Sequence, residues 1–312
     1  MLILLYVRLQ RQSTHSSIKA ELPMQDQSYR RGVLYIVLAG VFLSTGGLFV
    51  RFIEEASPWT VLFYRSLTFS ATVFVFMVLR HPGTFTNKLK AVRLSDLVIS
   101  ASLAFGFITY VLSLFSTSVA NTVLILSTGP VFAAILGWLV LRERVSVITW
   151  FAMVMAFAGV AVMVSGGIAA DDMRGILYAF LAVLSFAIMI VMLRRVPATH
   201  DSMAATALAG IIAAFICAFV MPTFSISLHD LMVSMALGCL QVGLGFILIT
   251  LGSRSVPSAQ VPLLALAETG LSPLWVWLLV NETPARNTLL GGSVVLCAVA
   301  FQGLAGLRNR KT

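Results

Sequence analysis

The sequence predicts an all-α polytopic membrane protein with ten transmembrane helices, arranged as two inverted five-helix repeats. Three observations support this fold class: the composition, the regular recurrence of long apolar runs, and a similarity between the two halves of the chain. Of 312 residues, 59% are hydrophobic and only 11% are charged, and the mean hydropathy is +0.97. Soluble domains carry about a quarter charged residues, so a water-soluble fold is excluded.

The first 31 residues differ from the rest of the chain. The opening "MLILLYV" is shorter than the roughly 20 residues that a span needs, and no basic segment precedes it, so it predicts neither a span nor a signal peptide. The segment from Arg8 to Arg31 is polar and basic. We therefore expect residues 1–31 to form a cytosolic N-terminal tail, with Met24 as an alternative first residue.

Ten apolar runs follow, each long enough to cross about 30 Å of hydrocarbon as a helix. They are continuously apolar, whereas the strands of a membrane barrel alternate between apolar and polar residues, so helices are favoured. The predicted spans are residues 33–52, 58–79, 94–115, 119–141, 145–165, 175–193, 202–222, 231–251, 257–280 and 288–307. Residues 308–312 are expected to form a cytosolic C-terminal tail.

The positive charges predict the orientation of these spans. Of the 21 lysines and arginines, 17 fall in the tails and in the loops on the same side of the bilayer as the tails. By the positive-inside rule, both termini are cytoplasmic, and we expect the chain in a plasma membrane of the bacterial inner-membrane type. The net charge of +9 is then a consequence of topology. It does not indicate a nucleic-acid partner, because no basic face with interleaved aromatic residues accompanies it.

Two sequence matches relate the halves. "GVLY" at Gly32 corresponds to "GILY" at Gly175, and "GWLVLRERVSVITWFA" corresponds to "VWLLVNETPARNTLLG", which pairs Trp138 with Trp277. The predicted repeats are residues 32–167 and 174–307. Because each contains an odd number of spans, the second copy would be inverted in the bilayer. Inverted repeats are typical of alternating-access transporters whose substrate site lies near the midplane.

Two longer segments carry a family resemblance. "STSVANTVLILSTGPVFAAILGWLVLRERV" and "RSVPSAQVPLLALAETGLSPLWVWLLVNETP", each followed by a helix rich in small residues, resemble the two EamA repeats of the drug/metabolite transporter superfamily. The resemblance covers about residues 32–307. It implies a secondary transporter, usually an exporter of amino acids or other small metabolites.

Arg65 and Glu268 are the two charged residues well inside the predicted spans. Counted along their helices, they lie roughly 10 Å and 14 Å below the outer surface, which is a similar depth. Either could instead be structural, Arg65 by reaching toward a helix end and Glu268 as a hydrogen-bond post between helices. The candidate substrate-binding residues are these two and the uncharged polar residues at comparable depth, chiefly Ser44, Tyr110, Asn121, Gln241 and Gln260.

The pairing of a guanidinium with a carboxylate suggests a substrate. Arg65 would bind the carboxylate of a zwitterion and Glu268 its ammonium group, which favours amino acids or related metabolites. Glu268 is equally suited to carry a coupling proton. The expected partners are therefore a small-molecule substrate, the lipid bilayer and protons.

Two other classes of function remain as alternatives, a membrane-embedded enzyme and a receptor or scaffold. The sequence contains no HExxH, GxSxG or Walker A motif, so we expect neither enzymatic activity nor a cofactor. Its three cysteines lack the spacing of a zinc site. Glu143 and Glu282 occupy matched helix ends and are expected to fix loops, while Pro130, Pro262 and Pro273 are expected to bend the fourth and ninth spans.

Overall fold

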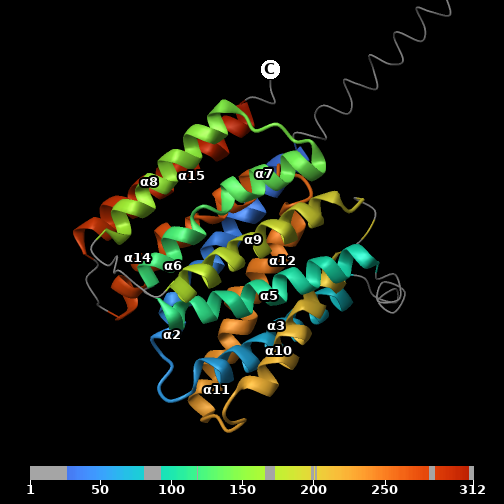
Figure 1. Cartoon of the computed structure of the whole chain (residues 1–312), viewed down its shortest axis with the longest axis vertical. Helices are drawn as coiled ribbons and strands as arrows, with labels where there is room; N and C mark the ends of the chain where they lie inside the picture. The colour runs from blue at the N-terminus through green and yellow to red at the C-terminus, as the bar shows by residue number, and fades with distance from the viewer. Residues whose placement is uncertain are drawn as a thin grey trace, which may run out of the picture.

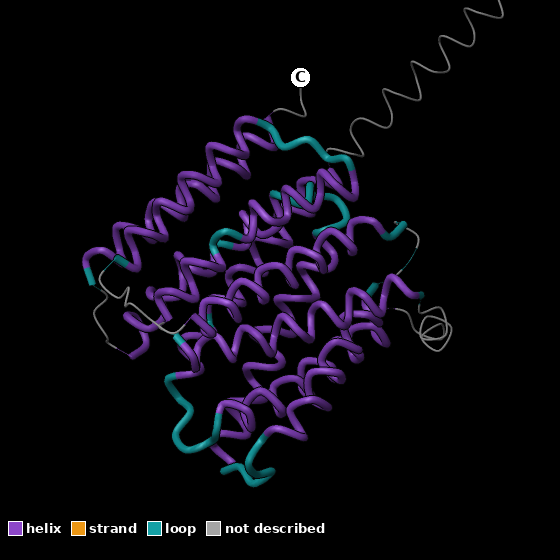
Figure 2. The backbone as a smooth tube through the Cα atoms, in the orientation of Figure 1, coloured by secondary structure: helices purple, strands orange, loops and turns teal. Residues whose placement is uncertain are grey.

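The computed structural model describes residues 27–80, 93–117, 119–165, 173–197, 200, 202–280 and 285–308. Within these ranges the chain is helical without any strand, and ten helical segments are long and apolar enough to cross a membrane (Figures 1 and 2). The predicted all-helical membrane fold and the number of spans are confirmed. Residues 1–26, His81, Asp172 and Glu282 lie outside the described residues.

We number the spans 1 to 10 in chain order. Span 1 (Gln27–Val50) ends in the short helix α2 (Gly46–Val50), and spans 2 and 3 are α3 (Pro58–Arg80) and α5 (Leu94–Ser116). The remaining spans are α6 (Val119–Leu126) with α7 (Gly129–Leu141), α8 (Val147–Val164), α9 (Met173–Arg195), α10 (Met203–Val220), α11 (Leu228–Ala236) with η1 (Leu237–Gly243) and α12 (Leu244–Gly252), α13 (Gln260–Ala265) with α14 (Ala267–Val280), and α15 (Arg286–Arg308).

Span 1 begins earlier than the sequence predicts. Residues 27–31 are helical, although they are polar and basic. Tyr29 is buried in the core, and its hydroxyl donates a hydrogen bond to Gln260 Oε1 (2.8 Å). This contact with a distant span explains why the helix begins at Gln27, before the residue at which hydropathy predicts its start.

The spans form a bundle with one peripheral pair. Helix α5 packs against both α9 and α10, α10 packs against α3, and α3 packs against η1. Helices α8 and α15 pack against each other along one side of the molecule (Figure 1). Spans 5 and 10 thus form an outer layer, while the other spans surround the centre.

Glycines allow several helices to touch backbone to backbone. A Cβ atom on Gly291 of α15 would lie 2.3 Å from the carbonyl oxygen of Gly159 on α8. In the same way, a Cβ atom on Gly238 would lie 2.4 Å from the carbonyl oxygen of Arg65. Membrane helices associate through van der Waals contact of this kind, because lipid chains are as apolar as the helices themselves.

Spans 4 and 9 are interrupted at corresponding positions. Span 4 breaks at Ser127 and Thr128, and span 9 breaks at Leu266. The alignment that pairs Trp138 with Trp277 places Thr128 opposite Ala267, the first residue of α14. The Ser127 hydroxyl donates to the Leu124 carbonyl, and the Thr128 hydroxyl donates to the Ile125 carbonyl, which also accepts from the Thr128 backbone N–H.

At the end of the bundle where span 1 begins and span 10 ends, which we call the terminal face, Glu143 joins the two halves. Arg142 closes α7 in a left-handed conformation (φ 57°) and turns the following chain back toward the bundle. The Glu143 carboxylate forms an ion pair with Arg194 and accepts hydrogen bonds from the Ser258 backbone N–H (2.9 Å) and hydroxyl (2.7 Å). This agrees with the expectation that Glu143 fixes a loop.

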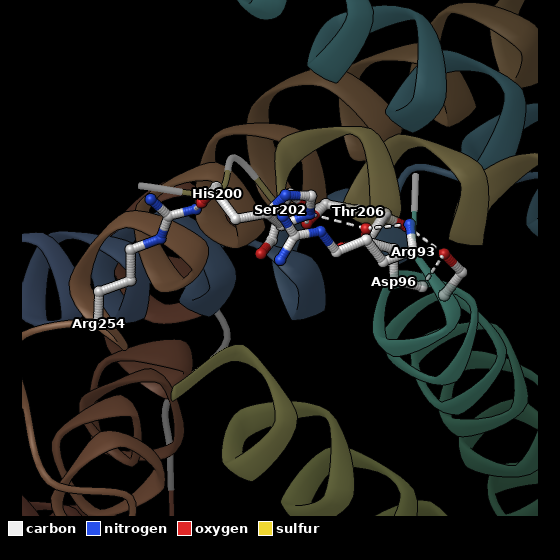
Figure 3. Close-up of polar contacts among 8 residues, drawn as sticks. Arg93, Asp96, His200, Ser202, Thr206 and Arg254 are labelled. Atoms are coloured by element: carbon white, nitrogen blue, oxygen red, sulfur yellow. Dashed lines mark hydrogen bonds and ion pairs between the residues drawn. The ribbon is translucent and has the colours of Figure 1, made fainter. Parts of the chain in front are cut away.

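A second group of contacts continues across the terminal face (Figure 3). Arg194 Nη1 donates to the Arg254 carbonyl (3.1 Å), and Arg254 Nη2 donates to the His200 carbonyl (2.5 Å). The His200 ring lies 2.7 Å from the Asp96 carboxylate at the start of α5. The ends of spans 3, 4, 6, 8 and 9 are thereby connected.

The opposite face is also tied together by a buried carboxylate. Asp230, at the start of α11, accepts hydrogen bonds from the backbone N–H groups of Glu54, Glu55 and Ala56 at 2.9 to 3.0 Å. These three residues belong to the connection between spans 1 and 2. Each end of the bundle therefore has a carboxylate that links the first five spans to the last five.

Two glycine substitutions in α15 test the backbone contacts. Gly291→Ala should lower the melting temperature of the purified protein, because overpacking of this kind costs about 1–3 kcal/mol. Gly303→Ala is the matched control: its Cβ atom would make an ordinary contact 3.8 Å from Val33. The control should be neutral or stabilising, because alanine favours a helix by about 1 kcal/mol over glycine. Equal melting temperatures for the two variants would contradict the packing.

Glu143→Ala tests the link at the terminal face. Its removal leaves Arg194 and Ser258 without their acceptor, and we expect a loss of about 2 kcal/mol in the free energy of unfolding. Glu55→Ala, which removes an exposed carboxylate, should leave the melting temperature unchanged. If both variants melt at the wild-type temperature, Glu143 does not hold the halves together.

Candidate functional site

A central cavity of about 220 Å³ lies between spans 1, 2, 3, 4, 6, 8 and 9. Most of its lining is aliphatic or aromatic, with a few polar groups on separate helices. This composition is typical of small-molecule sites, where apolar walls supply contact area and a few polar groups fix the orientation of the ligand. The polar lining residues are Arg65, Tyr110, Gln241, Glu268 and Thr269.

Arg65 reaches the cavity from α3. Its guanidinium lies over the ring of Phe107 on α5, 5.3 Å from the ring centroid, in the geometry of a cation–π contact. Its own carbonyl contacts Gly238 on the neighbouring span, which fixes this turn of α3 in the bundle. Among the described residues, no carboxylate forms an ion pair with Arg65. The charge therefore remains available inside the bundle.

Glu268 reaches the same cavity from the first turn of α14. The break at Leu266 makes this turn the start of a helix, where the helix dipole favours a negative charge. This turn of α14 packs closely against span 1, because a Cβ atom on Gly40 would lie 3.4 Å from the Glu268 backbone nitrogen. In the part of the chain that the structure describes, its carboxylate makes neither a hydrogen bond nor an ion pair.

The two charges face one cavity without contacting each other. Both side chains line it, and they do not form a direct ion pair. In a low-dielectric interior, an unpaired charge is costly, and it is normally paired or hydrogen-bonded. A ligand with a negative and a positive group would supply both missing partners.

Gln241 contributes an amide from η1. Its Nε2 atom donates to the Leu43 carbonyl on span 1 (3.3 Å), while its buried Oε1 atom has no hydrogen-bond partner. Tyr110 and three phenylalanines complete this part of the wall. Phe107, Phe186 and Phe246 come from three different spans and contact one another through their rings.

Four of the seven residues selected from the sequence thus line the cavity: Arg65, Tyr110, Gln241 and Glu268. The other three lie elsewhere. Ser44 is fully buried, where it donates to the Val41 carbonyl (2.6 Å) and accepts from Trp275 Nε1 (2.7 Å). Asn121 donates to Thr117 (3.1 Å), and Gln260 accepts from Tyr29 near the terminal face.

The sequence reasoning did not identify the aromatic wall or Thr269. Phenylalanine is abundant in all spans, so its type alone gives no signal. Thr269, however, directly follows Glu268 in the sequence. It also lies close to the break in span 9, which corresponds to the break in span 4. The sequence does not indicate the role of Arg194 at the terminal face either, because it identifies this residue only as a cytosolic positive charge.

Known proteins are similar to this chain over most of its length. A transporter of Archaeoglobus fulgidus, named as uncharacterized, is 26% identical over 274 residues, which cover 86% of this chain and 95% of that protein. An uncharacterized transporter of Synechocystis sp. is 26% identical over 312 residues, which cover 89% of this chain and 88% of that protein.

A solved crystal structure has the same fold. It superposes with a TM-score of 0.76 at 18% identity and covers 88% of this chain and 97% of its own. The EamA-like transporter family matches twice, over residues 30–165 and residues 173–303. With ten membrane spans around a central cavity and both halves matched, this chain belongs to the EamA-like transporter family.

Proposed function

We propose that this membrane transporter exports small zwitterionic metabolites, such as amino acids, across a bacterial inner membrane by alternating access. The observation that carries the proposal is the placement of Arg65 and Glu268 on one cavity without a direct ion pair. The substrate carboxylate binds the guanidinium, and the substrate ammonium binds the carboxylate. The apolar wall then contacts the remainder of the substrate.

The arrangement of the two halves supports alternating access. We propose that residues 32–167 and 174–307 are inverted repeats, because one family pattern matches both halves and spans 4 and 9 break at corresponding positions beside the cavity. Glu143 links the halves at one face and Asp230 at the other. When the cavity opens toward one face, the link at that face would break while the link at the opposite face would remain.

Glu268 offers a means of driving transport. A carboxylate inside an apolar cavity can bind a proton on one side of the membrane and release it on the other. We propose that proton binding and substrate ammonium binding compete at this one group. Export of a zwitterion would then be coupled to proton entry.

Substitution of the two charges tests the binding proposal. Glu268→Gln keeps the size and most of the hydrogen-bonding capacity of the side chain but removes the charge. Arg65→Gln also removes the charge and leaves a shorter side chain that still donates hydrogen bonds. Each should lower counterflow of amino acids in liposomes by tenfold or more, with little change in melting temperature. Glu55→Gln, an exposed carboxylate outside the cavity, should transport at the wild-type rate. Wild-type counterflow in Glu268→Gln at every pH between about 5 and 9 would refute the proposal.

The orientation is tested by single cysteines in a background without the three native ones. We propose cytoplasmic termini because 17 of 21 basic residues lie on that side. A cysteine at Arg195 should react in intact cells only with reagents that cross the membrane. A cysteine at His229 should react with impermeant reagents added outside. The reverse pattern would invert the topology and exchange the two faces.

A further inference from the structure

We infer that Gln241 accepts a hydrogen bond from the substrate and, with Glu268, restricts transport to substrates whose ammonium group carries N–H hydrogens. The inference rests on the proposed function and adds a rule of selectivity to it. A carboxylate attracts any cation, whereas a neutral amide oxygen binds only a group that donates a hydrogen. A substrate that satisfies both groups therefore needs a positive charge and at least one N–H group.

The first observation is the state of the amide. Gln241 is 9% exposed and lines the cavity, and its Oε1 atom is buried without a partner. A buried acceptor without a hydrogen bond is unfavourable, and native structures rarely contain one without a functional reason. The amide oxygen is therefore an unused acceptor on a residue that lines the cavity.

The orientation of the amide is set by its neighbours. Nε2 faces the Leu43 carbonyl, which can only accept a hydrogen bond, so the nitrogen end of the amide must point there. Gly46 leaves the necessary space, because a Cβ atom at this position would lie 2.3 Å from Nε2. Leu43 and Gly46 together hold the amide in one orientation, with its oxygen free.

The π-helical segment η1 brings Gln241 to this place. A π-turn adds one residue to a helix, and one residue rotates the side chains that follow by about 100°. Gly238 in η1 lies against the Arg65 carbonyl, so the widened turn is packed on span 2 beside the cavity cation. Such turns occur mostly at functional sites, where they aim one side chain differently from the rest of the helix.

Gln241 and Glu268 both pack against span 1. Gly40 contacts the Glu268 backbone, and Leu43 accepts the hydrogen bond from Gln241. Residues three positions apart lie on the same face of a helix on successive turns. Both acceptors are therefore anchored to one strip of span 1, while Arg65 approaches from span 2. A zwitterion would place its ammonium group at the strip and its carboxylate at Arg65.

The experiment compares leucine and phenylalanine with their N,N,N-trimethyl derivatives as competitors of counterflow in liposomes. Both amino acids suit the apolar wall. The trimethyl compounds keep the positive charge but have no N–H group. For the wild type, we expect trimethylation to weaken competition by more than tenfold. Gln241→Met keeps the length of the side chain and removes the acceptor. It should weaken competition by the parent amino acids roughly tenfold to a hundredfold and leave the trimethyl compounds unchanged.

Gln302→Met is the matched control. Gln302, on α15, is also buried with an unpartnered Oε1 atom, but it does not line the cavity. This variant should keep wild-type discrimination. If Gln241→Met is too unstable to reconstitute, Gly46→Ala displaces the amide without altering it and should produce the same loss of discrimination. Protection of the purified protein against heat by each compound gives a second readout that does not require transport.

The outcomes separate the two proposals. Transport of amino acids with equal competition by the trimethyl compounds would overturn the role of Gln241 and leave the proposed function intact. Full discrimination in Gln241→Met would do the same. If the wild type neither transports nor is stabilised by any zwitterion, both proposals are wrong.

Discussion

Backbone contact between helices, made possible by glycine, is the constraint on which the rest of this bundle depends. Hydrophobic burial drives the packing of soluble helices, but it offers little inside a bilayer, so these helices must approach closely enough for van der Waals contact. Gly159 with Gly291, and Gly238 with the Arg65 carbonyl, satisfy this need directly. The cavity lies beside the interruptions of spans 4 and 9.

Polar groups are treated differently at the ends and at the centre of the bundle. Glu143 and Asp230 accept several hydrogen bonds each, and both tie loops to neighbouring spans. Arg65, Glu268 and Gln241 instead keep unused hydrogen-bonding capacity around the cavity. The carboxylates at the two ends are satisfied within the protein, whereas the proposed ligand would complete these three groups at the cavity. The contrast is the main physical reason for treating the cavity as a binding site.

Most of the fold could be predicted from the sequence, because the length and hydropathy of a span are local properties. Depth along a helix also predicts a similar level for Arg65 and Glu268, and the structure places both on one cavity. Depth does not determine which way a side chain faces, which is why Ser44 bonds to Trp275 and Gln260 to Tyr29, away from the cavity. The π-turn at Gln241 has no hydropathy signature, since one extra residue leaves an apolar run unchanged. Contacts between distant loops, such as Glu143 with Arg194, leave no local pattern either.

Under the proposed alternating access, the hydrogen bonds of Glu143 would also link opening of the terminal face to water. While the face is closed, one carboxylate accepts from both the backbone N–H and the hydroxyl of Ser258 at the start of span 9. When the halves separate, these donors, Arg194 and the carboxylate itself all need new partners, and only solvent can provide them at once. Opening is then a hydration event as much as a movement of helices. Osmolytes that lower the activity of water would shift the resting population toward the closed form, independently of any substrate.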